Sequence, residues 1–133
     1  MVTDRIGDFI IRLQNAAAIS RREVAAPYSG FLLEIAKKLK QLGFITRVEV
    51  KEKEGSAKKT LVVELAYSEN GGARLHGVKR VSKPGRRLYT SHQGAHRVRG
   101  GVGSRILTTS AGVLSDVEAR KAKVGGEELF EIW

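Results

Sequence analysis

The chain has 133 residues, a formal net charge of +10 and a sequence pI of about 10.2. The absence of cysteine excludes disulfides, thiolate metal sites and cysteine nucleophiles, and the absence of an apolar run of about 18 residues excludes a membrane-spanning helix. Because 41% of the residues are hydrophobic, the composition predicts a soluble, intracellular, folded protein whose partner carries negative charge.

Two helices are predicted in the first half of the chain. Thr3 is placed to cap the first, with Asp4 in its first turn, and Ser29 is placed to cap the second, which Gly43 ends. The residues expected to face the core recur at helical spacing: Ile6, Phe9, Ile10, Leu13 and Ala17 in the first helix, and Leu32, Ile35, Ala36, Leu39 and Leu42 in the second, with Lys37, Lys38 and Lys40 outside it.

Strands dominate the rest of the chain. A short strand is expected before Pro27, and strands 44–50 and 60–67 form a hairpin around a charged turn. The turn signal Asn70-Gly71-Gly72 predicts a boundary between an N-terminal subdomain, 1–69, and a C-terminal one, 70–133. The fold class is therefore α+β, with two packed subdomains. The second is expected to contain strands 77–81, 87–90, 105–109 and 127–133, a glycine-rich loop at 91–104, and one short helix that the capping box Ser115–Glu118 opens and that ends before Gly125.

The positive charge is concentrated in the middle of the sequence. Residues 70–115 carry nine Lys and Arg and all three histidines, but no Asp or Glu. Such a stretch repels itself unless something neutralises it. A nucleic-acid surface is one explanation, since fixed cations displace condensed counterions from phosphates. An anionic membrane, an acidic protein and a solvated loop region with counterions are the others.

The densest cationic segment, 79–89, surrounds a Pro-Gly turn and precedes Tyr89. Gly85 suits the positive φ of a type II turn. A phosphate backbone fits such a basic corner, and Tyr89 would stack on a base or sugar. The alternative is a solvated hairpin with Tyr89 in the core. The cations that can point the same way around this turn are Lys83, Arg86 and Arg87.

A second candidate contact is the end of the strand 105–109, where three hydroxyl residues precede a glycine. Small hydroxyl side chains and exposed backbone amides let RNA approach closely and bond base edges or 2′-hydroxyls. An ordinary Ser/Thr turn explains the same residues equally well. The segment reads Thr108-Thr109-Ser110-Ala111-Gly112.

Three patterns typical of other functions are incomplete. The glycine cluster at 100–103 lacks Walker spacing and a Lys-Ser/Thr end. His92 and His96 are four residues apart, but no third metal ligand is in view. Ser110 and Asp116 could be drawn into a triad with a histidine, yet no nucleophile elbow surrounds the serine. The sequence therefore predicts no cofactor, no metal and no catalysis.

The most specific motif lies near the C-terminus. Residues 108–116 follow the pattern S-T-S-x-G-[IV]-M-[ST]-D, with Thr108 for the first serine and Leu114 for the methionine, and Ala119-Arg120 and the run 124–127, V-G-G-E, come after it. Supporting matches are residues 12–16, 35–37, 43–45 and 79–85. In these runs nearly the whole chain resembles the bacterial small-subunit ribosomal protein S-eight family.

The resemblance implies a protein of the cytoplasmic ribosome, with neighbouring small-subunit proteins and no membrane. Members of that family bind the central domain of small-subunit ribosomal RNA and help to organise it during assembly. Some also repress their own operon by binding its messenger. In this chain Glu127 is expected to accept hydrogen bonds from a hydroxyl or an amide and so to position the 108–112 loop. The residues expected to bind RNA are Lys58, Lys59, Lys83, Arg86, Arg87, Tyr89, Thr108, Thr109, Ser110, Ala111, Gly112, Gly125 and Gly126.

The chain departs from the family at Ala111, where members often have Lys, so one phosphate contact is missing. Whether Arg97, Arg99 and Arg105 compensate is left open by the sequence. Basic residues of 79–105, helped by Lys58 and Lys59 at the tip of the N-terminal hairpin, are predicted to supply salt-sensitive affinity for RNA. The loop at Thr109-Ser110 is predicted to supply selectivity. Two alternatives stay open: an accessory subunit of a nucleic-acid-processing enzyme, and a basic module that docks on an acidic protein.

Overall fold

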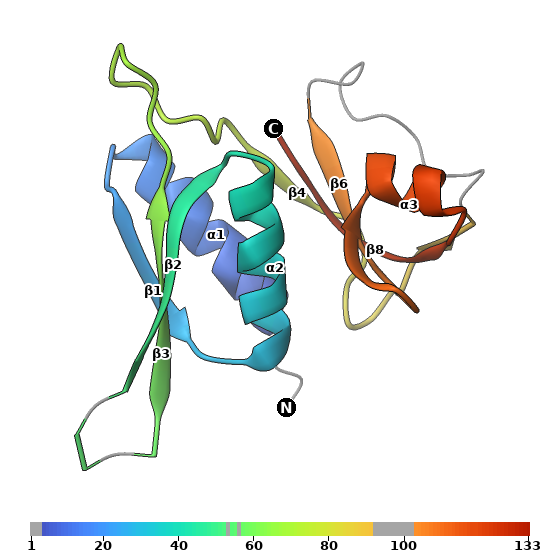
Figure 1. Ribbon diagram of the computed structural model, residues 1–133, viewed down its shortest axis with the longest axis horizontal. Coiled ribbons are helices and arrows are strands. Elements are labelled where there is room, and N and C mark those ends of the chain that lie inside the picture. Colours follow the sequence, from blue (N-terminus) through green and yellow to red (C-terminus); the bar gives the residue numbers. More distant parts are fainter. Residues whose placement is uncertain (1–3, 53, 56, 92–102) are drawn as a thin grey trace. The chain divides into compact units, whose positions relative to one another are not determined.

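A computed structural model describes residues 4–52, 54–55, 57–91 and 103–133, which form two compact units (Figure 1). The N-terminal unit comprises residues 8–76, and the C-terminal unit comprises residues 77–133 together with the described part of residues 1–7. The predicted turn at Asn70-Gly71-Gly72 forms, with the Ser68 N–H donating to the Gly72 carbonyl at 2.8 Å. The boundary predicted after residue 69 stays a prediction. No helix in the described ranges is long and apolar enough to cross a membrane.

The N-terminal unit is a three-stranded antiparallel sheet with helices on one side (Figure 1). β1 (Glu23–Pro27) and β2 (Ile45–Glu52) both pair with the central β3 (Lys59–Leu65). α1 (Arg5–Ala18) and α2 (Gly30–Gln41) cover the sheet. The predicted hairpin is confirmed, since β2 and β3 are antiparallel neighbours. The core side chains that are essentially inaccessible include Phe9, Leu13, Ile35, Leu39, Leu61 and Val63.

Helix α1 differs from the prediction at its start. It begins at Arg5, and the Asp4 carboxylate, just before it, accepts the Gly7 N–H at 3.0 Å. Asp4 is therefore a cap and not a residue of the first turn. The predicted cap Thr3 lies outside the described residues. Along the helix, Ala16 is buried in place of the expected Ala17, which is half-buried.

Helix α2 is capped as predicted, because the Ser29 hydroxyl accepts the Leu32 N–H at 3.1 Å. Its last residue is Gln41 and its C-cap is Leu42, which is half-buried and not part of the fully buried face; Gly43 follows with φ +91. Lys38 was expected outside but is buried, and its Nζ donates to Gln41 Oε1 at 2.8 Å. A long aliphatic stem can be buried while its charged end finds a partner.

The C-terminal unit is a five-stranded antiparallel sheet in which β8 (Gly126–Ile132) is central. β4 (Val78–Arg80) and β5 (Tyr89–Thr90) pair with one edge of β8, and β6 (Ser104–Thr109) pairs with the other. β7 (Gly112–Ser115) follows β6, and α3 (Asp116–Ala122) packs against β6 and β7. Ile106, Leu107 and Phe130 lie fully buried in this unit.

In the C-terminal unit the predicted start of α3 is confirmed, whereas one strand was not predicted. The capping box is confirmed: the Ser115 hydroxyl accepts the Glu118 N–H at 3.3 Å, and Glu118 Oε1 accepts the Ser115 N–H at 3.2 Å. Strand β7 was not predicted, because four residues between a turn and a helix cap are too few to show strand periodicity.

Candidate nucleic-acid interface

The two segments singled out in the sequence lie on neighbouring strands at one end of the C-terminal sheet. The register places Tyr89 of β5 opposite Glu127 of β8, and Glu127 opposite Thr108 of β6. In the next row, Gly126 lies between Thr90 and Thr109. The tyrosine and the hydroxyl residues are thus separated by only one strand, within a single unit.

The hydroxyl turn, residues 109–112, joins β6 to β7. Thr109 and Gly112 form the last residue pair, and Ser110 and Ala111 are the tip. The Thr109 hydroxyl donates to the Gly112 carbonyl at 2.9 Å and accepts the Ala111 N–H at 3.1 Å. Gly112 has φ +107, a backbone conformation that residues with a side chain disfavour. This explains why a glycine follows Ser110 and Ala111 at the end of the turn.

Ser110 and Thr109 therefore differ in what they offer a ligand. Ser110 is exposed, and its hydroxyl has no hydrogen-bond partner among the described residues. Thr109 is half-buried, and its hydroxyl closes the turn. Ala111 is also exposed. Of these two hydroxyls, that of Ser110 is available to a ligand and that of Thr109 shapes the turn.

Gly125 and Gly126 allow β8 to approach its neighbours closely. A Cβ added at Gly126 would lie 2.1 Å from the Thr108 carbonyl oxygen, and one added at Gly125 would lie 2.2 Å from the Thr90 carbonyl oxygen. Both distances are far inside van der Waals contact. These glycines were expected to bind RNA, and the structure gives both of them a packing reason.

The basic turn, residues 83–86, lies between β4 and β5. Lys83 and Arg86 exchange two backbone hydrogen bonds, both of 2.9 Å. Their side chains are exposed and form no ion pair within the described ranges. Gly85 does not have a positive φ, so the predicted type II turn is wrong. Tyr89 is 72% exposed, which excludes the alternative that it lies in the core.

The Glu127 carboxylate holds the segment next to the basic turn. Its Oε2 accepts the Ser82 hydroxyl at 2.5 Å and an Arg87 N–H at 3.0 Å. Glu127 was expected to accept a hydrogen bond from a hydroxyl or an amide and so to position the 108–112 loop. Among the described residues, the Glu127 side chain instead fixes residues 82 and 87. Arg87, predicted to bind RNA, is half-exposed and already has a counter-ion.

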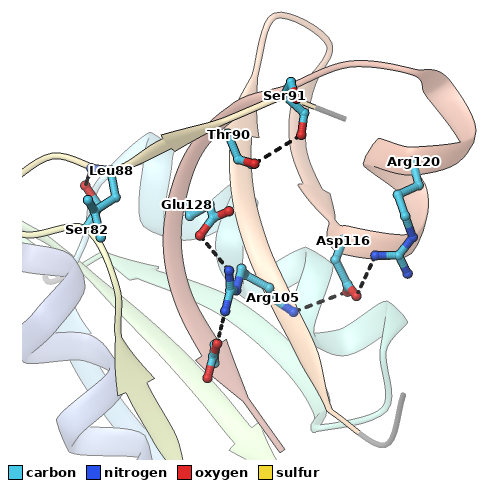
Figure 2. A network of polar contacts seen from close by, with 9 residues as sticks. Ser82, Leu88, Thr90, Ser91, Arg105, Asp116, Arg120 and Glu128 are labelled. Carbon is cyan, nitrogen blue, oxygen red and sulfur yellow. Dashed lines mark hydrogen bonds and ion pairs between the residues drawn. The ribbon is translucent and has the colours of Figure 1, made fainter. Parts of the chain in front are cut away.

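Arg105 is committed to an internal ion-pair network (Figure 2). Its side chain is 17% exposed, and it bonds Glu128 at 2.6 Å and also Glu131. Its backbone N–H donates to Asp116, whose carboxylate pairs with Arg120 at 3.3 Å. Arg105 therefore does not replace the cation missing at position 111. The other two candidates, at 97 and 99, lie outside the described residues.

Arg80 is a second cation held inside the C-terminal unit. It pairs with Asp4 at 2.9 Å, and its Nε donates to the Ser82 carbonyl. Burial lowers the pKa of Arg80, and the nearby Asp4 carboxylate opposes that shift. Its NH1 is buried without a hydrogen-bond partner in the part of the chain that the structure describes.

The two lysines predicted to assist binding belong to the N-terminal unit. Lys59 lies 3.3 Å from a Glu52 carboxylate oxygen and 5.6 Å from the centroid of the Tyr28 ring. Lys58 is exposed at the same end of β3. Their contribution to a nucleic-acid surface stays a prediction.

These features define a basic α+β protein of two units, whose C-terminal unit carries a hydroxyl turn, an exposed tyrosine and a basic turn with the exposed cations Lys83 and Arg86. The described residues contain no cluster of three or more His, Asp or Glu that could hold a metal ion. His92 and His96, the incomplete metal-ligand pattern noted in the sequence, lie outside the described residues.

Comparison with known proteins identifies the family. The family model described as Ribosomal protein S8 matches residues 4–133. The chain is 41% identical over 133 residues to the small ribosomal subunit protein uS8 of Sorangium cellulosum, with 100% of both chains covered. It is 46% identical to the uS8 protein of Salinispora arenicola and 43% identical to that of a Nocardioides species, each time over 99% of this chain and 98% of the relative. The chain belongs to the ribosomal protein S8 family, which confirms the resemblance drawn from its C-terminal motif.

Proposed function

We propose that this protein is a structural constituent of the small ribosomal subunit that binds the central domain of its RNA and aids assembly. The observation that carries the proposal is the exposed Ser110 hydroxyl, on a turn built by Thr109, one strand away from the exposed Tyr89. The names of the relatives, small ribosomal subunit protein uS8, support the same role. Neighbouring subunit proteins and the operon messenger are further expected partners.

The mechanism divides affinity from selectivity. Lys83 and Arg86 are exposed cations without an ion-pair partner in the described ranges, so they supply the salt-sensitive contact with phosphates. Ser110 both donates and accepts hydrogen bonds, so it reads a base edge or a 2′-hydroxyl. Tyr89 offers a ring on which a base or sugar stacks. The pairing of β5 and β6 with β8 holds Tyr89 and the hydroxyl turn on one sheet.

Footprinting on whole small-subunit RNA tests partner and site together. We expect the protein to protect a compact part of the central domain from nuclease at moderate salt. Protection spread evenly along the RNA would argue for general polyanion binding. If no RNA is protected and protein partners are retained after nuclease treatment, the protein is instead a module that docks on an acidic protein.

Substitutions in the hydroxyl turn test selectivity. Ser110→Ala should weaken binding to a central-domain transcript by about 1–3 kcal/mol if the RNA group it contacts is left buried and unpaired. Binding to bulk transfer RNA should change far less. Thr109→Ser keeps the hydroxyl that shapes the turn and serves as the control for Thr109→Ala, which removes it. Equal losses on both RNAs would contradict a selective role for the turn.

A further inference from the structure

Ser82 is a fully buried polar residue beside the basic turn, and it was not among the residues expected to bind RNA. Its exposed fraction is 0%. Its hydroxyl donates to Glu127 Oε2 at 2.5 Å and accepts the Leu88 N–H at 3.2 Å. One side chain thus joins the segment after β4, the segment before β5 and the start of β8. Figure 2 shows Ser82 facing Leu88.

These bonds close a loop around the basic turn. The Leu88 carbonyl accepts the Glu128 N–H at 2.9 Å, so Leu88 is fixed on both sides, by Ser82 and by β8. Residues 83–87 lie between the two ends of this loop, and Tyr89 follows it directly. The Ser82 hydroxyl is therefore one of the contacts that fix both ends of the segment carrying the two cations and the exposed ring.

Arg87 completes the arrangement by neutralising the carboxylate. Its NH1 donates at 3.0 Å to Glu127 Oε2, the oxygen that also accepts the Ser82 hydroxyl. A carboxylate beside a phosphate-binding turn repels RNA unless a cation offsets it. Arg87 is thus a brace and a counter-ion for Glu127, whereas Lys83 and Arg86 remain available to phosphate.

We propose that Ser82, acting through Glu127 and Leu88, is the positioning residue that sets the basic turn and Tyr89 for RNA binding, and that Arg87 supports this network instead of contacting phosphate. The inference rests on the proposed function and deepens it. According to the proposal, the buried network of Ser82, Glu127 and Leu88 holds Lys83 and Arg86 in the positions from which they bind phosphate.

The chain offers a matched control for the loss of a buried hydroxyl. Ser115 is also buried, and its hydroxyl also accepts a backbone N–H, but at the start of α3. Ser82→Ala and Ser115→Ala are compared for dissociation constant on a central-domain transcript over a series of KCl concentrations, at a temperature where both remain folded by circular dichroism. We expect about tenfold weaker binding for Ser82→Ala. Its log–log salt slope should fall by about one or more, while Ser115→Ala should match the wild type.

Substitutions of Arg86 and Arg87 distinguish a phosphate contact from a residue that supports the buried network. Arg86→Ala should lower the salt slope by about one, as expected for one lost phosphate contact. Arg87→Ala should weaken binding most at low salt, because it exposes the Glu127 charge to RNA and added salt screens that repulsion. Adding Glu127→Gln to Arg87→Ala should restore part of the affinity, since glutamine still accepts the Ser82 hydroxyl but carries no charge.

The outcomes distinguish the inference from the function on which it rests. If the wild-type protein does not bind the transcript, the proposed function fails and the inference fails with it. If the wild type binds and Ser82→Ala binds equally well with the same slope, only the inference is overturned. An Arg87→Ala protein that regains no affinity when Glu127→Gln is added would overturn the role given to Arg87.

Discussion

Replacing Arg105 tests whether internal ion pairs hold the C-terminal unit together. The guanidinium, 17% exposed, lies between the carboxylates of Glu128 and Glu131, whose side chains are 10% and 18% exposed. Arg105→Ala leaves these two buried negative charges without their cation. Breaking a buried pair from one side costs about 3–5 kcal/mol, and part of the arginine stem is lost from the packing as well.

Tryptophan fluorescence gives a local readout of this loss. Trp133 is the single tryptophan of the chain, and it exchanges backbone hydrogen bonds of 3.0 and 3.1 Å with Gly77 in the C-terminal unit. We expect the urea midpoint monitored by Trp133 to fall markedly for Arg105→Ala. A loss of about 3 kcal/mol corresponds to a drop of roughly 10 °C in melting temperature for a chain of this size.

A second variant separates charge from packing. Arg105→Met combined with Glu128→Gln and Glu131→Gln removes all three charges and keeps most of the side-chain volume, so it should be closer to the wild type than Arg105→Ala. An Arg105→Ala protein with an unchanged midpoint would refute the reasoning. Arg105→Ala should also leave the salt slope of RNA binding unchanged where the protein is folded, because the guanidinium is paired internally.

Four further substitutions probe the packing and the caps. Asp4→Asn keeps an oxygen for the Gly7 N–H but removes the counter-ion of buried Arg80. Thermal unfolding should therefore show that the free energy of unfolding falls by about 1–2 kcal/mol. Arg80→Met, which removes the buried charge itself, should leave the free energy of unfolding nearly unchanged. Gly126→Ala places a Cβ 2.1 Å from the Thr108 carbonyl, and chemical denaturation should show a loss of about 3 kcal/mol; wild-type stability would mean that the strands can separate. Ser115→Ala should lose about 1 kcal/mol in the same assay, through the cap of α3, and no loss would contradict the capping box.

The elements that could be predicted from sequence are those with local signals. Ser29 and Gly43 bracket α2, and the Ser115–Glu118 pair opens α3, because capping depends on residues within one turn of each other. The hairpin of β2 and β3 was recognisable from two apolar runs around a charged turn. In the candidate site, the exposed Tyr89 and Ser110 were anticipated for the same reason, since both lie in short motifs.

What could not be predicted depends on contacts distant in sequence. Residues 70–115 looked unneutralised because their counter-ions lie elsewhere: Glu128 and Glu131 reach Arg105 across strands, and Asp4 reaches Arg80 from the first residues. The bond of Ser82 to Glu127 spans 45 residues and leaves no local pattern. Cross-strand register, which no single sequence displays, thus decides which cations remain available.

The central position of β8 has a consequence for how the protein is made. β4, β5 and β6 precede it in the chain, yet each completes its hydrogen bonding only against β8. During translation β6 can pair first with β7, but among the described strands β4 and β5 pair only with β8, so the sheet is completed late, through pairings distant in sequence. Until then its apolar residues need protection, and a nascent chain halted before Gly126 is a natural target for chaperones.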